Sequence, residues 1–329
     1  MNTTLDWKMA RSGKGRPVFQ RIRRLIPPIF ISTVLWCASV CGSLHAETPG
    51  NVLILNSDMS IANYSLVHTR FKSRLSGLKH EIDLGSKWTD ESKISDAIRN
   101  ADPDVIYCIG SKAYLLAHKL AENKHLIFTS LINWRRFPMG KNTYGISTEL
   151  LPNMQLMTYR YFFPEINKIG VLYSKDYNKE WFDIAVKSAK ETGIAIVGKP
   201  VNRQDEIASN LKELLPRVDA LWLIPDPVAL PKVELVAEIF KESDLAQKPV
   251  FTYSDTFADL GATFIISADI PTIGQQAAEL AMDLLSDRKL PEKVQTPAGS
   301  HIILNLRMVE KYRIKFNTEA LDSVNQIIK

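Results

Sequence analysis

Residues 104–119, DVIYCIGSKAYLLAHK, join two different hydrophobic periodicities at one point. The first part is a short apolar run that is typical of a buried strand. After Gly110 and Ser111, apolar residues recur from Ala113 to Leu120 at the three- and four-residue spacing of a helix. A strand that passes directly into a helix is the repeating unit of a parallel α/β sheet. This stretch therefore predicts an α/β fold.

The same alternation of strand and helix patterns continues in both directions and occurs as two successive series. The strands predicted for the first series are 51–56, 80–85, 104–110, 125–132 and 143–148, and those for the second are 168–174, 194–201, 220–226, 249–255 and 262–269. Segments of helical pattern separate them, and no low-complexity linker lies between the two series. We therefore predict two doubly wound parallel-sheet lobes of α/β class.

The N-terminal 46 residues have the composition of a secretory signal peptide. A basic region at 8–24 precedes an apolar stretch that ends at Ala46, before Glu47. An uncleaved membrane anchor is the alternative, but Pro27 and Pro28 interrupt the apolar stretch. We predict a cleaved signal and a periplasmic protein.

Removal of this segment changes the charge of the chain. It holds seven of the 41 basic and one of the 36 acidic residues, which leaves 34 basic and 35 acidic residues. The basic character therefore belongs to the leader, and a role in nucleic-acid binding is not expected.

The sequence carries no pattern that indicates catalysis, a metal or a cofactor. Cys108 is the one cysteine beyond the leader, and its apolar strand predicts a buried hydrophobic side chain. The histidines lack metal-ligand spacing, and neither a G-x-S-x-G motif nor a glycine-rich phosphate loop is present. We predict that the protein is not an enzyme and needs no cofactor.

Ligands of open parallel sheets bind beyond the carboxyl ends of the strands, so the residues there are the candidate ligand contacts. These candidates are Ser57, Asp58, Gly110, Ser111, Asn133, Trp134, Tyr173, Asn178, Asp226, Ser254 and Asp255. The amide groups behind Gly110 and Ser111 would suit an anion, and Asp226 would suit a cation. Several of these residues are equally typical of helix caps, and Trp134 could be a cleft wall or a local lid.

Several segments resemble the ABC-transporter substrate-binding proteins of the tryptophan or aromatic amino-acid type. They are DPDVIYCIGSKA, YGIST, FPEINKIGVLYS, VDALWLIPD, PVFTYSD, GATFIISADIPTIGQQAAELAMDLLSDRKLP and HIILNLRMVEKYRI, in matching order over 100–315. The resemblance implies the type I periplasmic-binding-protein fold with three crossings between lobes. It implies a first lobe of 47–147 plus about 265–292, and a second of 148–264 plus about 293–329. When the family's positions are matched to this sequence, the resemblance implies that the ligand contacts Gly110, Ser111, Asn178, Asp226, Ser254 and Asp255. Asn133 and Trp134 depart from the family pattern.

The resemblance implies a protein that closes on a small ligand, such as an amino acid, and delivers it to an ABC permease in the inner membrane. Closure requires that the ligand contacts both lobes. The alternative is a periplasmic sensor of the same fold that reports to a membrane signalling protein.

Overall fold

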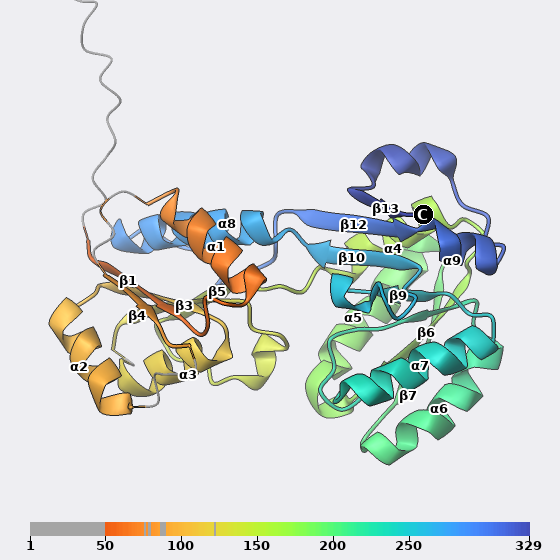
Figure 1. The fold of residues 1–329 in the computed structure, drawn as a ribbon, viewed down its shortest axis with the longest axis horizontal. Helices are drawn as coiled ribbons and strands as arrows, with labels where there is room; N and C mark the ends of the chain where they lie inside the picture. The colour runs from red at the N-terminus through yellow and green to blue at the C-terminus, as the bar shows by residue number, and fades with distance from the viewer. Residues whose placement is uncertain (1–49, 76, 78–79, 86–89, 122) are drawn as a thin grey trace, which may run out of the picture. The chain divides into compact units, whose positions relative to one another are not determined.

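The computed structural model describes residues 50–75, 77, 80–85, 90–121 and 123–329. The predicted signal peptide, 1–46, lies outside this part of the chain. Among the described residues, no helix combines the length and the apolar character needed to span a bilayer. The described residues form two sheets, each with helices on both faces (Figure 1).

The first sheet has the strand order β11-β5-β4-β3-β1-β2, and all its pairs are parallel. Its strands are β1 (Val52–Asn56), β2 (His80–Asp83), β3 (Val105–Ile109), β4 (His125–Thr129), β5 (Thr143–Ile146) and β11 (Val294–Gln295). Helices α1 (Ala62–Lys72) and α8 (Ile270–Leu285) cover one face, and α2 (Glu91–Ala101) and α3 (Ser111–Leu120) cover the other (Figure 1). Strand β1, which lies between β3 and β2, is thus buried on both faces.

The second sheet has the order β13-β12-β10-β9-β8-β6-β7. Its strands are β6 (Lys168–Tyr173), β7 (Ala195–Pro200), β8 (Ala220–Trp222), β9 (Val250–Thr252), β10 (Phe264–Ala268), β12 (Ser300–Asn305) and β13 (Gln326–Ile328). Its helices are α4 (Pro152–Phe162), α5 (Lys175–Thr192), α6 (Ile207–Leu214), α7 (Val233–Leu245) and α9 (Leu306–Lys311). The pair β10–β12 is antiparallel, so this sheet is mixed.

Short 3-10 helices complete the chain. They are η1 (Trp134–Arg136), η2 (Gln204–Glu206), η3 (Leu215–Arg217), η4 (Asp255–Phe257) and η5 (Thr318–Ser323). Of these, η1 follows β4 and contains Trp134, and η4 follows β9 and contains Asp255; the sequence predicts both residues as ligand contacts.

The hydrophobic pattern of β1 explains why helices cover both faces of the first sheet. Val52 and Ile54 join the apolar cluster under α1 and α8, whereas Leu53 and Leu55 join the cluster under α2 and α3. Successive side chains of a strand point to opposite faces, so an uninterrupted apolar strand needs cover on both. The predicted α/β class with two lobes is confirmed.

Three segments connect the lobes: residues 147–151, Asp269 and residues 296–299. The second and third crossings lie a few residues later than the expected boundaries near 265 and 293. The second sheet keeps β10 through Ala268 because β10 pairs along its full length with β12. The first sheet keeps Val294 and Gln295 because they pair with β5.

The corner between β3 and α3 requires glycine. Gly110 has a φ of 81°, and a Cβ there would lie 2.7 Å from both Ser57 Oγ and the Tyr64 ring. The Ser57 hydroxyl accepts a hydrogen bond of 3.0 Å from the backbone N–H of Ala113, in the first turn of α3. This close approach fixes the strand-to-helix turn.

Candidate functional site

A cavity of about 490 Å³ lies at the carboxyl ends of strands from both sheets. Its volume is within the usual range for small-molecule pockets. The first lobe contributes the start of α1 and the loop after β4, the second lobe contributes the ends of β8, β9 and β10, and two crossings complete the lining. The lining residues are Asn63, Tyr64, Leu66, Ser130, Ile132, Thr148, Pro225, Tyr253, Ser254, Asp255, Ser267, Ala268, Asp269, Ile270, Pro271 and His301.

The first-lobe side of this cavity is partly apolar. Ile132 is 59% exposed and Leu66 is 37% exposed, although both are large hydrophobic side chains. Ser130 has a φ of 59° and Asn133 a φ of 54°, so the loop after β4 holds two non-glycine residues in the left-handed region. Such conformations are unfavourable and often occur at binding sites. This wall offers apolar surface that an organic ligand would cover.

The second-lobe side is polar and acidic. Asp255 is exposed to the cavity, and Asp269 caps α8 by accepting a hydrogen bond of 3.0 Å from the backbone N–H of Thr272. Ser267 and His301 face each other across the antiparallel pair β10–β12. Among the described residues that line the cavity there is no Lys or Arg. The carboxylates therefore favour a ligand with positive charge.

Tyr253 adds a hydroxyl to the lining of the cavity. Burial, together with the nearby carboxylate of Asp226, raises the pKa of Tyr253 to about 12. Its hydroxyl therefore stays protonated at neutral pH and can donate a hydrogen bond.

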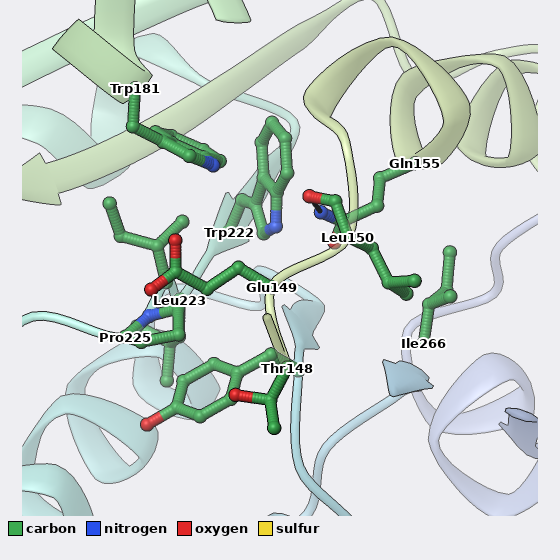
Figure 2. Close-up of a pocket in the computed structure, with 11 residues that line it drawn as sticks. Thr148, Glu149, Leu150, Gln155, Trp181, Trp222, Leu223, Pro225 and Ile266 are labelled. Carbon is green, nitrogen blue, oxygen red and sulfur yellow. Dashed lines mark hydrogen bonds between the residues drawn. The ribbon is translucent and has the colours of Figure 1, made fainter. Parts of the chain in front are cut away.

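A second, much smaller cavity adjoins the first and has a volume of about 20 Å³ (Figure 2). Thr148, Pro225 and Tyr253 line both cavities. The other lining residues of the small cavity are Glu149, Leu150, Gln155, Trp181, Trp222, Leu223, Ile224 and Ile266. The two cavities thus share a wall at the first crossing.

The family model described as ABC transporter substrate binding protein matches residues 80–328, which is more than half of the chain. The chain belongs to this family. Its members are substrate-binding proteins and are typically extracytoplasmic.

Solved structures of low sequence identity share the fold of this substrate-binding protein. One is a ligand-free, open substrate-binding protein with adhesive properties from Clostridium difficile, with a TM-score of 0.63, 16% identity, and coverage of 85% of this chain and 99% of that one. Another is an ABC domain in complex with L-Trp from Streptococcus pneumonia, with a TM-score of 0.57, 18% identity, and coverage of 84% and 100%. A search of curated proteins finds no match. The fold is that of a type I periplasmic binding protein.

The substrate-binding protein places the eleven predicted contact residues in different surroundings. Ser254 and Asp255 line the large cavity, and Ser254 also caps η4. The remaining nine are not among the described residues that line it: Ser57, Asp58, Gly110, Ser111, Asn133, Trp134, Tyr173, Asn178 and Asp226. The structure therefore brings together two of the eleven at this cavity.

At the first-lobe corner, one of the amide groups of the expected anion site already has an acceptor within the fold. Ser57 Oγ accepts a hydrogen bond from the backbone N–H of Ala113. Ser111 is exposed beside Lys112 on the outer side of α3. Asp58 accepts hydrogen bonds from the backbone and the hydroxyl of Ser60, and these bonds lower its pKa. Ser57 and Asp58 thus use oxygen acceptors in local turns.

Trp134 is packed between its neighbours. Its ring lies 6.2 Å from that of Phe128 in the core under α3, and the Arg135 guanidinium stacks over it at 4.6 Å. Asn133 is buried and precedes η1. This geometry favours the local lid over the cleft wall.

Asp226 is buried, with 3% of its surface exposed, and five donors converge on its carboxylate. One oxygen accepts from the backbone and hydroxyl of Ser174 at 2.6 and 2.8 Å and from the Asn178 side chain at 2.8 Å. The other accepts from the backbone N–H groups of Val228 and Ala229, both at 2.9 Å. These bonds fix the loop after β8 to the corner between β6 and α5.

Tyr173 also lies inside the second lobe. Its ring stacks on Phe182 with centroids 4.1 Å apart and an interplanar angle of 5°. Both residues crowd Gly198, where a Cβ would lie 2.2 Å from Phe182. The contact assigns Tyr173 to the packing of β6, β7 and α5.

Several residues that line the cavities are not among those predicted from the sequence. Tyr64 lies in the first turn of α1, which follows β1, and Ser130 lies in the loop after β4, so their position after strands could have indicated them. His301 lies at the start of β12, and only the antiparallel pairing brings that end beside the carboxyl end of β10. Glu149, on the first crossing, carried no sequence signal.

Proposed function

We propose that this substrate-binding protein closes on a small organic ligand that bears a protonated amine, such as an amino acid. The observation that carries the proposal is the cavity of about 490 Å³ whose lining comes from both lobes and from the crossings. A ligand that touches both lobes stabilises the closed form relative to the open form. The acidic second-lobe side supports a cationic group, and Leu66 and Ile132 support an apolar part.

The proposal assigns the cavity to binding alone, without catalysis. Among the described residues, no three His, Cys, Asp or Glu side chains are grouped so as to hold a metal ion. Cys108 is buried, and burial raises the pKa of its thiol, so it is a poor nucleophile.

Thermal-shift screening of the purified protein against amino acids, amines, organic acids and sugars tests the proposal. A ligand at 100 times its Kd should stabilise the folded state by about 2.7 kcal/mol. Asp255→Asn should reduce the shift, because Asp255 lines the cavity, whereas Asp259→Asn in the same loop should not. If no class of compound raises the melting temperature, the proposed function fails.

We further propose that the protein is secreted to the periplasm and delivers its ligand to an ABC permease. The leader at 1–46 supports secretion, and the family supports a permease partner. N-terminal sequencing of the protein recovered from the periplasm should begin at Glu47. ATP hydrolysis by a permease encoded beside this chain should rise on addition of the ligand-loaded protein and not of the Asp255→Asn variant.

A further inference from the structure

Glu149 is a buried carboxylate with one oxygen left free by the fold. Its side chain is 9% exposed, and Oε2 forms an ion pair of 2.5 Å with Arg135. Oε1 is buried and has no hydrogen-bond partner within the part of the chain that the structure describes. An unpaired buried oxygen is costly, so its position calls for a partner.

The free oxygen belongs to a carboxylate that borders the small cavity. Figure 2 shows the Glu149 side chain extending from the first crossing into the space beside the rings of Trp181 and Trp222. The two indoles pack edge to face, with centroids 4.8 Å apart. Both are buried, so the Glu149 carboxylate and two aromatic rings enclose one space.

The dimensions of this space restrict what can enter it. A volume of about 20 Å³ holds a group the size of a water molecule and excludes a ring. Gln155 does not supply the missing donor, because its amide donates to the backbone oxygen of Leu150 at 3.1 Å. A protonated primary amine has the right size and carries the donors that Oε1 lacks.

The small cavity adjoins the large one, and the two share lining residues. Thr148, Pro225 and Tyr253 line both, so a ligand in the large cavity is within reach of the small one. Burial raises the pKa of the Glu149 carboxyl, while Arg135 and the backbone N–H of Asn133 oppose this shift. A second cation would further favour the charged form. Aromatic faces add attraction for such a cation.

We propose that Glu149 Oε1 binds the protonated primary amine of the ligand, with Trp181 and Trp222 forming the walls around it. This inference rests on the proposed function and names the contact that would select amines. The ammonium group would form a charge-assisted hydrogen bond in a site from which bulk water is excluded.

The test compares amines with alcohols of the same shape. The probes are phenethylamine and 2-phenylethanol, butane-1,4-diamine and butane-1,4-diol, and L-leucine and 2-hydroxy-4-methylpentanoate, titrated by calorimetry together with any compound found by thermal shift. We expect the amine of a pair to bind to the wild-type protein. The affinity of Glu149→Gln for this amine should be about 10- to 100-fold lower, which is the loss typical of one hydrogen bond to a charged group. The affinity for each alcohol should be the same in the wild-type protein and in Glu149→Gln.

Glu165→Gln is the matched control, because Glu165 is a surface carboxylate paired with Lys315 at 2.8 Å. It should leave amine affinity unchanged. Glu149→Asp, which keeps the charge, should retain a preference for amines, and circular dichroism should show that all variants fold.

The outcomes separate this inference from the proposed function. Binding of amines with equal affinity by wild type and Glu149→Gln, or binding of non-amine ligands alone, overturns the role of Glu149 and leaves the binding function standing. A water molecule held by Oε1 in the presence of bound amine, seen in a crystal structure, also overturns it. Absence of any ligand in the broad screen refutes both.

Discussion

Asp226 and Glu149 are two buried carboxylates near Pro225, and their surroundings are opposite. Asp226 accepts five hydrogen bonds from the corner of β6 and α5 and from its own loop. Glu149 has one ion-pair partner on Oε2 and none on Oε1 among the described residues. The first is satisfied by the fold, and the second retains an acceptor for something else.

Burial of a charged group therefore does not by itself indicate function. What matters is whether the protein supplies all the donors that the carboxylate can use. The corner at Ser57 and Gly110 belongs with Asp226, because its polar groups complete a turn. Substitutions at these residues should distinguish polar groups that are satisfied by the fold from the Glu149 carboxylate, and Asp226 should show the largest effect.

Asp226→Ala should be strongly destabilising, because it removes the acceptor of five donors, including the backbone N–H groups of Val228 and Ala229. We expect a loss of about 4 kcal/mol in the free energy of unfolding, measured with urea. Asp259→Ala, in an exposed turn, should cost less than about 0.5 kcal/mol. Equal stability of the two variants would mean that Asp226 does not clamp its loop.

Gly110→Ala should be the next largest effect. Residue 110 has a positive φ, and the added Cβ would lie 2.7 Å from Ser57 and Tyr64. We therefore expect the free energy of unfolding to fall by about 3 kcal/mol. Gly77→Ala separates the two causes, because Gly77 has a φ of 92° with nothing within 4 Å of the added Cβ. It should cost only about 1 kcal/mol. Equal losses in thermal unfolding would show that crowding at the corner is unimportant.

Ser57→Ala should cost about 1 kcal/mol in urea unfolding, because the N–H of Ala113 loses its acceptor. Ser111→Ala changes an exposed hydroxyl at the same corner and should be within about 0.5 kcal/mol of wild type. A ligand contact at Ser57 would instead show as lost affinity with unchanged stability.

Glu149→Gln should change how stability depends on pH. Because burial raises the pKa of Glu149 above its ordinary 4.5, the folded protein binds this proton more tightly than the unfolded chain. The resulting stabilisation is present below pH 4.5 and is lost as the pH rises through the folded-state pKa. Wild-type stability relative to Glu149→Gln should therefore fall over this window in urea titrations.

Glu213→Gln provides a control of opposite sign. Lys199 lowers the pKa of the exposed Glu213 carboxyl, so its smaller contribution is present above pH 4.5 and is lost as the pH falls through the lowered pKa. The stability difference between wild type and Glu149→Gln could prove independent of pH, or could rise with pH as for Glu213→Gln. Either result would contradict the burial of Glu149.

Much of the fold could be predicted from local sequence patterns. The run before Gly110 became β3, the helical spacing after it became α3, and the two series of strands became two sheets. The antiparallel placement of β12 could not be read from its own residues, because an apolar strand does not reveal the direction of its neighbour.

The candidate site was less accessible to prediction for a related reason. Ser254 and Asp255 were identified from their place after a strand, and they line the cavity. Ser57 and Asp226 have equally suggestive places, but Ser57 accepts a hydrogen bond from Ala113 and Asp226 accepts one from Ser174, among others. A position after a strand therefore selects candidates without telling caps from ligand contacts.

The sequence by itself determined the alternation of strands and helices, because the spacing of apolar residues depends only on local backbone geometry. Only the tertiary structure decided which polar atoms are already paired, since their partners lie far away in the chain. Asp226 meets Ser174 across 52 residues, and Glu149 meets the indoles of Trp181 and Trp222 only because the crossing passes beside the second sheet. Hydrogen bonds act over about 3 Å, so function at this site depends on contacts that no linear pattern encodes.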